Sequence, residues 1–200
     1  MSYLPKDAKR KAILDATLSL VVSCGFAGIT ARKVAAEMGA ATGTIHHHFK
    51  SLDALKSEVV SYASEMAEEH DRQRIEGQSP LEALKTLLLP SKFPNREFEN
   101  RVWLSAADEM WRNESLKDAY CRSMNWITDE LETIIKRGIE LGDFKPTLDA
   151  RKCAWKFMAT AFTISSYTYL GDDRLDLKTV DEIVMSDIET TLGITALNGS

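Results

Sequence analysis

Apolar residues recur at helical spacing along nearly the whole chain, and this pattern limits the possible folds more than any other feature. In residues 6–24, for example, Leu14, Leu18 and Val21 follow one another at intervals of four and three residues, which places them on one face of a helix. We find no run in which apolar and polar residues alternate strictly, as they would in a half-buried strand. The sequence therefore predicts an all-α protein.

Glycines and capping residues divide this pattern into about nine helices. Gly25, Gly39 and Gly142 stand where a helix should end, because glycine adopts the left-handed backbone that closes a last turn. Thr30 precedes a helical stretch, as an N-cap would. The expected helices cover residues 6–24, 31–38, 42–49, 53–75, 81–89, 95–112, 115–141, 146–170 and 178–192.

The composition excludes several classes of protein. The chain has 200 residues, of which 44% are hydrophobic, with 10 Gly and 5 Pro, so it is neither disordered nor collagen-like. It holds no apolar stretch of about 20 residues and no apolar signal core near its start, so we expect a cytoplasmic protein with no membrane partner. The three cysteines are far apart and odd in number, which favours reduced core residues over disulfides or a metal site. They are Cys24, Cys121 and Cys153.

Charge is distributed unevenly, although the net charge of −5 would by itself argue against a nucleic-acid partner. Residues 1–56 carry eight Lys and Arg against four acidic residues, a balance of +4, whereas the remainder has a balance of −9. Such asymmetry suggests one end that faces nucleic acid, joined to a body with another role. Chance clustering of surface charge is the alternative explanation.

The basic end contains two short helical stretches separated by a glycine-containing turn, within residues 30–55. This is the pattern of a helix-turn-helix unit. Ala35 is small where the two helices must approach each other, and Met38, Ile45 and Phe49 would fill the space beneath. The side chains available to the outside are Arg32, Lys33, Thr42, Thr44, His47 and Lys50.

This segment resembles the DNA-binding head of the TetR family of bacterial transcriptional repressors. The resemblance implies a three-helix, helix-turn-helix domain over residues 8–68, with the helix-turn-helix at about 31–50. It also implies a larger C-terminal helical bundle over residues 69–195, for ligand binding and dimerisation. The residues that carry the resemblance are Gly25, Phe26, Thr30, Val34, Ala35, Gly39, Thr42, Gly43, Thr44, Ile45, His48, Phe49, Ser51 and Leu55.

The resemblance implies that the head binds double-stranded operator DNA. A helix about 10–12 Å across fits the major groove, and basic side chains beside it contact phosphates. Lys9, Arg10 and Lys11 would flank this interface. The residues expected to bind DNA are Thr30, Arg32, Lys33, Thr42, Gly43, Thr44, His46, His47 and Lys50.

Three positions depart from the usual pattern of the family. Ala41 stands in place of a capping Ser, so we expect Thr42 to cap the third helix instead. His46 replaces a Tyr that reaches a phosphate, and an imidazole can still donate a hydrogen bond there. Leu52 replaces a common Lys and removes one phosphate contact. These changes bear on the strength of the DNA contacts and leave the class of protein unchanged.

The run His46-His47-His48 raises the alternative of a metal site, and with it a metal-dependent hydrolase. Consecutive helical residues point about 100° apart, however, so the three imidazoles cannot meet at one tetrahedral ion. No further spacing typical of metal ligands accompanies them. We therefore expect no metal, no cofactor and no catalytic residue, and a protein that is not an enzyme.

The resemblance implies a homodimer formed through the last two helices. The stretch 154–164 is apolar nearly all round, as in a buried helix, and the last helix carries one apolar stripe. Two-fold pairing would place two recognition helices on half-sites about 34–36 Å apart in a palindromic operator. A purely intramolecular core is the alternative. The expected interface residues are Trp155, Met158, Phe162, Val180, Val184 and Ile188.

The resemblance further implies a small-molecule pocket in the C-terminal domain. The stretch from Trp103 to Phe144 is similar to BetI-like members, which include choline-sensing repressors. Aromatic rings beside Asp108 could hold a quaternary ammonium group, although ordinary core packing explains the same apolar faces. The residues expected to line the pocket are Trp103, Ala107, Asp108, Met110, Trp111, Tyr120, Met124, Ile127 and Phe162.

The sequence thus predicts a DNA-binding transcriptional regulator, in the first instance a repressor, that acts at the bacterial nucleoid. A small-molecule effector of unknown identity would bind the body and release the dimer from DNA by changing the separation of its recognition helices. The alternative is a protein of the same fold that acts as an architectural or partner-binding factor on DNA without a ligand.

Overall fold

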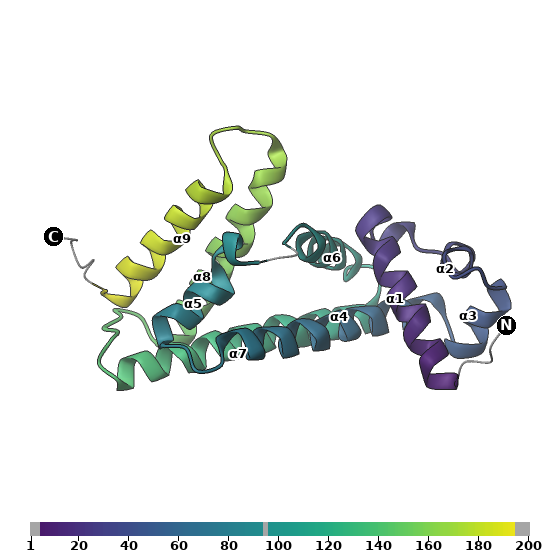
Figure 1. The fold of residues 1–200 in the computed structure, drawn as a ribbon, viewed down its shortest axis with the longest axis horizontal. Helices are drawn as coiled ribbons and strands as arrows, with labels where there is room; N and C mark the ends of the chain where they lie inside the picture. Colours follow the sequence, from purple (N-terminus) through teal and green to yellow (C-terminus); the bar gives the residue numbers. More distant parts are fainter. Residues whose placement is uncertain (1–4, 94–95, 195–200) are drawn as a thin grey trace. The chain divides into compact units, whose positions relative to one another are not determined.

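The computed structural model describes residues 5–93 and 96–194, and it is built from α-helices (Figure 1). These ranges contain no strand, which confirms the predicted all-α class. Three short 3₁₀ turns lie at Phe26–Gly28, Pro90–Lys92 and Thr168–Leu170. The nine α-helices of the described ranges are Lys6–Cys24 (α1), Ala31–Glu37 (α2), Thr42–His48 (α3), Leu52–Ile75 (α4), Pro80–Leu88 (α5), Arg96–Glu109 (α6), Glu114–Glu140 (α7), Ala150–Tyr167 (α8) and Leu177–Leu192 (α9).

Two helices end in the glycine motif that the sequence predicts. At the end of α2, Gly39 has a φ of +61°, and the N–H of the following residue donates to the carbonyl of Ala35 at 2.8 Å. At the end of α7, Gly142 has a φ of +79°, and the N–H of the following residue donates to the carbonyl of Gly138 at 2.9 Å. Both are Schellman motifs, in which a left-handed residue lets the chain satisfy the last carbonyls of the helix.

Other helix boundaries differ from the prediction. α8 begins at Ala150 instead of 146, because the side chain of Asp149 accepts a hydrogen bond from the N–H of Lys152 at 3.0 Å and thereby provides the N-cap. α6 ends at Glu109 instead of 112, and the chain then turns before α7 begins. Asn95, which the sequence places at the start of this helix, lies outside the described residues.

The three cysteines are free thiols, but the expectation that they are core residues holds for only one of them. Cys153 is buried in α8, whereas Cys24 and Cys121 are exposed. Cys24 is the last residue of α1 and lies beyond the buried face of that helix. Cys121 lies beside Arg122 on an exposed part of α7.

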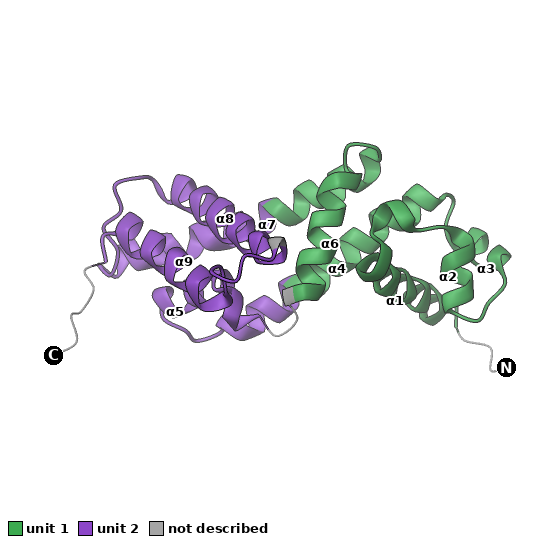
Figure 2. Ribbon diagram, turned by 90° about the horizontal axis from the view of Figure 1, so that it is seen from above, with its two compact units in different colours: residues 1–67, 97–124 green, residues 68–96, 125–200 purple. Residues whose placement is uncertain are grey.

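The chain folds into two compact units, each of which combines separate segments (Figure 2). Unit 1 comprises residues 1–67 and 97–124, and unit 2 comprises residues 68–96 and 125–200. Both α4 and α7 therefore begin in unit 1 and end in unit 2. The functional division into residues 8–68 and 69–195 remains a prediction, and the compact units differ from it because residues 97–124 group with the head.

Unit 1 has its own hydrophobic core, to which both of its segments contribute. Ile13 of α1, Val34 of α2 and Leu55 of α4 are fully buried. Val102 of α6 and Leu116 of α7 belong to the same core. Each such side chain stabilises the fold by about 1.5–3 kcal/mol relative to its exposed state. The three-helix head is therefore completed by helices that come about 50 residues later in the chain.

Unit 2 is a helical bundle around a second core. Leu84 of α5, Ile135 of α7, Phe157 of α8 and Val184 of α9 are all buried there. α8 and α9 lie side by side in this unit (Figure 1). In the described part of the chain, no helix combines the length and the apolar character that crossing a membrane requires.

Candidate nucleic-acid interface

α2 and α3 form the helix-turn-helix unit that the sequence predicts. Val34 and Ala35 of α2 are fully buried, and Ile45 of α3 and Phe49 just beyond it are buried as well. Met38 packs against the same core but is only partly buried. This buried inner face packs α2 and α3 against the rest of the head, and the outer face of both helices remains uncovered.

The outer face of this unit is in contact with solvent. Arg32 and Lys50 are exposed, and the side chain of neither forms a hydrogen bond or ion pair with any residue that the structure describes. Thr44 is half-buried. The other residues predicted to bind DNA are all exposed, namely Thr30, Lys33, Thr42, Gly43, His46 and His47.

Only part of the positive charge in residues 1–56 is available to a ligand. Lys33 donates to the carbonyl of Gly28 at 2.7 Å, and Lys11 pairs with a neighbouring aspartate at 2.9 Å. Lys56 is buried in an ion pair, and Arg10 is paired with a carboxylate of α4. The sequence shows where the Lys and Arg residues lie in the chain, but it does not show which of them are paired with other residues. The cations of this segment that lack a partner among the described residues are Lys6, Lys9, Arg32 and Lys50.

The two helices of the unit start differently. Thr30 caps α2 as predicted, because its Oγ1 accepts a hydrogen bond from the N–H of Lys33 at 3.2 Å. Thr42 does not cap α3, so that expectation is wrong. Ala41 has the extended backbone of an N-cap residue, and Thr42 is already the first helical residue. Alanine has no side-chain acceptor for these N–H groups, so α3 begins without a side-chain cap.

The three consecutive histidines have different surroundings. His46 and His47 are exposed on α3, whereas His48 is half-buried and its ring meets that of His47 edge-to-face at 5.3 Å. The Nδ1 atom of His48 is buried and has no hydrogen-bond partner in the described residues. In the same part of the chain, no group of three or more His, Cys, Asp or Glu side chains is arranged to hold a metal ion.

The head should lose stability in mild acid because of His48. Burial, with repulsion from His47 and Arg10, holds the pKa of His48 below its ordinary value of 6.5. The unfolded chain therefore binds this proton more readily, so the free energy of unfolding falls as pH drops below 6.5 toward the folded-state pKa. Urea denaturation at pH 7.5 and 5.5 measures the loss. His48→Gln should reduce this loss of unfolding free energy. His46→Gln, at an exposed position of the same helix, should leave it unchanged. Equal losses in both variants would contradict the role of His48.

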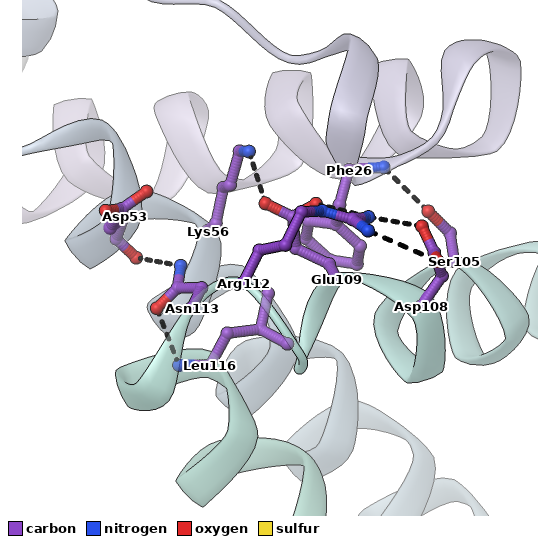
Figure 3. A network of polar contacts seen from close by, with 9 residues as sticks. All are labelled: Phe26, Asp53, Lys56, Ser105, Asp108, Glu109, Arg112, Asn113 and Leu116. Carbon is purple, nitrogen blue, oxygen red and sulfur yellow. Dashed lines mark hydrogen bonds and ion pairs between the residues drawn. The ribbon is translucent and has the colours of Figure 1, made fainter.

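The turn between α1 and α2 lies against α6 within unit 1. The backbone N–H of Phe26 donates to Ser105 Oγ of α6 at 2.7 Å (Figure 3). Gly25 has a φ of +67°, and a Cβ at this position would lie 2.9 Å from the same oxygen. Glycine is therefore required both by the backbone conformation and by the close approach of α6.

A second contact joins α6 to the first turns of α4. The ammonium group of Lys56 lies 2.6 Å from Glu109 Oε1, and both side chains are buried (Figure 3). Arg112 reaches the other oxygen of Glu109 at 3.3 Å and also pairs with Asp108. Asn113 donates to the carbonyl of Asp53 at 3.3 Å. The end of α6 and the turn after it are thus held on the head by polar contacts.

The residues predicted to line a ligand pocket are divided between the two units. In unit 1, the rings of Trp103 and Tyr120 lie 6.5 Å apart and, with Met110, pack on the core of the head. Burial raises the pKa of Tyr120 above 10.0, its ordinary value. Ala107 and Met124 are half-buried in unit 1. Ile127 and Phe162 are half-buried in unit 2.

Two of these predicted pocket residues lie at the surface. Trp111 is 77% exposed, although helical spacing continued from Trp103 and Ala107 would place it on the same face. The reason is that α6 ends at Glu109, after which helical spacing no longer applies. Asp108 is exposed and paired with Arg112, whose hydrogen bond lowers the pKa of the carboxyl group.

The predicted dimer residues also fall into two groups. Val180, Val184 and Ile188 are buried within the core of unit 2 itself. Trp155 is 57% exposed, with the guanidinium of Arg151 5.7 Å from its ring centroid. Met158 and Phe162 are half-buried. On α9, Leu177 and Ile183 are exposed apolar residues, and the sequence prediction included neither of them.

A cavity in unit 2 was not expected from the sequence. It has a volume of about 230 Å³ and lies between the end of α4 and the C-terminal turns of α7. No motif indicates it, because its residues come from segments more than 50 positions apart. It is lined by Arg72, Ile75, Glu76, Gly77, Glu130, Thr133, Ile134 and Arg137.

Comparison with known proteins gives matches of two kinds. Residues 13–59 match the family model described as bacterial regulatory proteins, tetR family. Over 191 residues, the chain is 23% identical to the HTH-type transcriptional regulator PksA of Bacillus subtilis (strain 168), and the match covers 92% of this chain and 90% of that protein.

Solved structures share the fold over nearly the whole chain. A protein from Saccharomonospora viridis, solved in complex with choline, superposes with a TM-score of 0.82 at 22% identity, covering 92% of this chain and 96% of that one. A TetR-family transcriptional regulator from Agrobacterium tumefaciens gives a TM-score of 0.81 at 23% identity, covering 94% and 100%.

Proposed function

We propose that the chain is a DNA-binding transcriptional regulator of the TetR type, because residues 13–59 match that family, and that it represses transcription from a palindromic operator. It binds as a homodimer at the bacterial nucleoid and leaves the DNA when a small molecule binds the body. The observation that supports this most directly is the outer face of α2 and α3, where Arg32 and Lys50 are exposed without a described partner.

α3 is the recognition helix in this proposal. Its inner side is anchored by Ile45, so its outer side can enter the major groove, where Thr44 contacts a phosphate or a thymine methyl group. Arg32 and Lys50 contact phosphates on either side and supply a salt-dependent part of the affinity. Gly43 adds no side chain to the first turn of α3, and nothing lies within 4 Å of where its Cβ would be.

Dimerisation would use the exposed face of α8 and α9. Trp155 and Ile183 are large apolar residues on these helices that remain exposed in the single chain. An isologous contact through this face would cover them and relate two recognition helices by a two-fold axis. Val180, Val184 and Ile188, which are buried within unit 2, would then support the interface helices from behind.

The effector would be sensed through α6 and α7, whose aromatic residues Trp103 and Tyr120 lie together in unit 1. A quaternary ammonium compound is the first effector to test, since a relative of the same fold was solved with choline. The alternative is a DNA-bound architectural factor without a ligand. Thermal-shift measurements distinguish the two, because only a sensor is stabilised specifically by a small molecule.

The proposal predicts that Thr44→Ala and Lys50→Ala each weaken operator binding. Selection of bound sequences from random DNA first identifies the palindrome, and Kd is then measured across a salt series. Loss of a base contact costs about 1–3 kcal/mol, and loss of a phosphate contact also reduces the salt slope by about 1. Lys178→Ala, at an exposed position of α9, is the control. Unchanged affinity in both head variants, or no palindrome, would contradict the proposal.

A further inference from the structure

Arg10, in the second turn of α1, contacts both the end of α3 and the side of α4. Its Nη1 donates to the backbone carbonyl of His48 at 2.6 Å, and its Nε donates to Glu58 Oε1 at 2.7 Å. Its Nη2 donates to the other oxygen of Glu58, so the pair is bidentate. The guanidinium group also lies over the ring of Phe49, 4.2 Å from the ring centroid.

These contacts act on the end of the recognition helix. His48 is the last residue of α3, and its carbonyl is one of those that a helix leaves without an intrahelical partner. A guanidinium group at this position donates a hydrogen bond to the carbonyl. Its positive charge also interacts favourably with the negative end of the helix dipole. Phe49, the next residue, is buried in the head core. Arg10 therefore holds the end of α3 through a hydrogen bond to His48 and a cation–π contact with Phe49.

The same contacts leave Arg10 poorly suited to bind a phosphate. All three of its guanidinium nitrogens already donate to protein acceptors. The carboxylate of Glu58 accepts two hydrogen bonds from Arg10, in the bidentate arrangement that a phosphate would otherwise use. It also balances the charge of Arg10. Displacing Glu58 would leave a carboxylate without its partner beside a polyanion.

We propose that Arg10 is a positioning residue for DNA recognition. It fixes the last turn of α3 against α1 and α4, and in this way sets the angle at which α3 enters the groove. This rests on the proposed function, in which the head binds an operator. Loss of Arg10 should therefore reduce the discrimination between operator and other DNA, with little effect on the electrostatic part of the affinity.

Three variants test this against simple phosphate binding: Arg10→Ala, Arg10→Lys and Glu58→Gln. We expect each to raise the operator Kd about tenfold or more, while Kd for non-specific DNA changes less than about twofold. Lys keeps the charge of Arg10 but cannot form the two-pronged contact. The dependence of log K on log salt concentration should stay as in the unmodified protein, because no phosphate contact is lost.

The opposite pattern would overturn the proposal. If Arg10 binds a phosphate, Arg10→Ala reduces the salt slope by about 0.9, and Arg10→Lys binds nearly as well as the unmodified protein. Glu58→Gln then tightens binding, because it removes a negative charge near the DNA. Arg32→Ala is the matched control, since this exposed cation has no described partner and should itself reduce the slope by about 0.9.

Hydrogen exchange of the full chain without DNA tests the contact between Arg10 and α3 independently of operator binding. In Arg10→Ala, the amides at Ile45–Phe49 should exchange about tenfold faster or more, while those of α8 stay protected as before. Unchanged protection at Ile45–Phe49 would overturn the positioning role whether or not the protein binds an operator. Faster exchange in a protein that selects no operator would support the contact at α3 and reject the proposed function.

Discussion

Replacing Lys56 by Met is expected to lower the free energy of unfolding by about 3–5 kcal/mol. The change leaves the carboxylate of Glu109, whose side chain is 6% exposed, with only the longer contact to Arg112 at 3.3 Å. A buried charge without its partner is strongly destabilising, far more than the lost attraction alone would suggest. Urea denaturation of the full chain measures the effect. Because the pair joins α4 to α6, the variant should also loosen α6 from the head.

Two further variants test this explanation. Lys117→Met breaks an exposed pair with Glu114 and should change the stability by no more than about 0.5 kcal/mol. Combining Lys56→Met with Glu109→Leu removes both charges and should recover most of the loss, because apolar residues of similar volume replace buried ion pairs well. A loss below about 1 kcal/mol in Lys56→Met alone would show that Arg112 by itself compensates the charge of Glu109, and would contradict this explanation.

Gly138→Ala should destabilise unit 2 by about 2 kcal/mol or more, although alanine is the better helix former. Gly138 lies inside α7, and a Cβ there would lie 2.8 Å from Cγ of Phe144 and would overlap Cδ2 and Cε2 of the same ring. The ring cannot withdraw easily, because it is 2% exposed and its own N–H donates to the carbonyl of Gly138 at 3.1 Å. Thermal denaturation should show a decrease in Tm of about 2–4 °C per kcal/mol.

Gly43→Ala provides the contrast within the same chain. It also lies inside a helix, but nothing is found within 4 Å of its Cβ position. The variant should therefore gain up to about 1 kcal/mol from helix propensity. Replacing the ring by a smaller aliphatic side chain in Gly138→Ala/Phe144→Leu should recover part of the lost stability. If Gly138→Ala were as stable as the unmodified protein, the ring of Phe144 would not be packed tightly against α7.

Local features of this protein could be predicted from its sequence. Thr30 as the N-cap of α2, and Gly39 and Gly142 as the residues that end α2 and α7, follow from short-range backbone chemistry. The buried faces of α2 and α3 follow from helical spacing. The end of α6 did not follow, because Met110 and Trp111 continue the apolar pattern of Trp103 and Ala107 past Glu109, where the helix stops.

Features that depend on distant residues could not be predicted. Arg10 and Lys56 look like surface cations in the sequence, and their partners lie 48 and 53 residues away. Helical periodicity shows which face of a helix is apolar but not which helix covers it. For the same reason, the apolar stripe of α9 predicts Val180 in a dimer interface, although this residue is fully buried in the core of unit 2.

The two-segment construction of unit 1 has a consequence for synthesis of the protein. Ile13 and Leu55 emerge from the ribosome well before Val102 and Leu116, which complete the same core. Until then, the nascent head exposes an apolar surface that no later part of α4 can cover. Loop closure over such distances slows folding and prolongs the exposure of that surface to aggregation. The DNA-binding end is thus translated first but completes its folding only after more than half of the chain has been made.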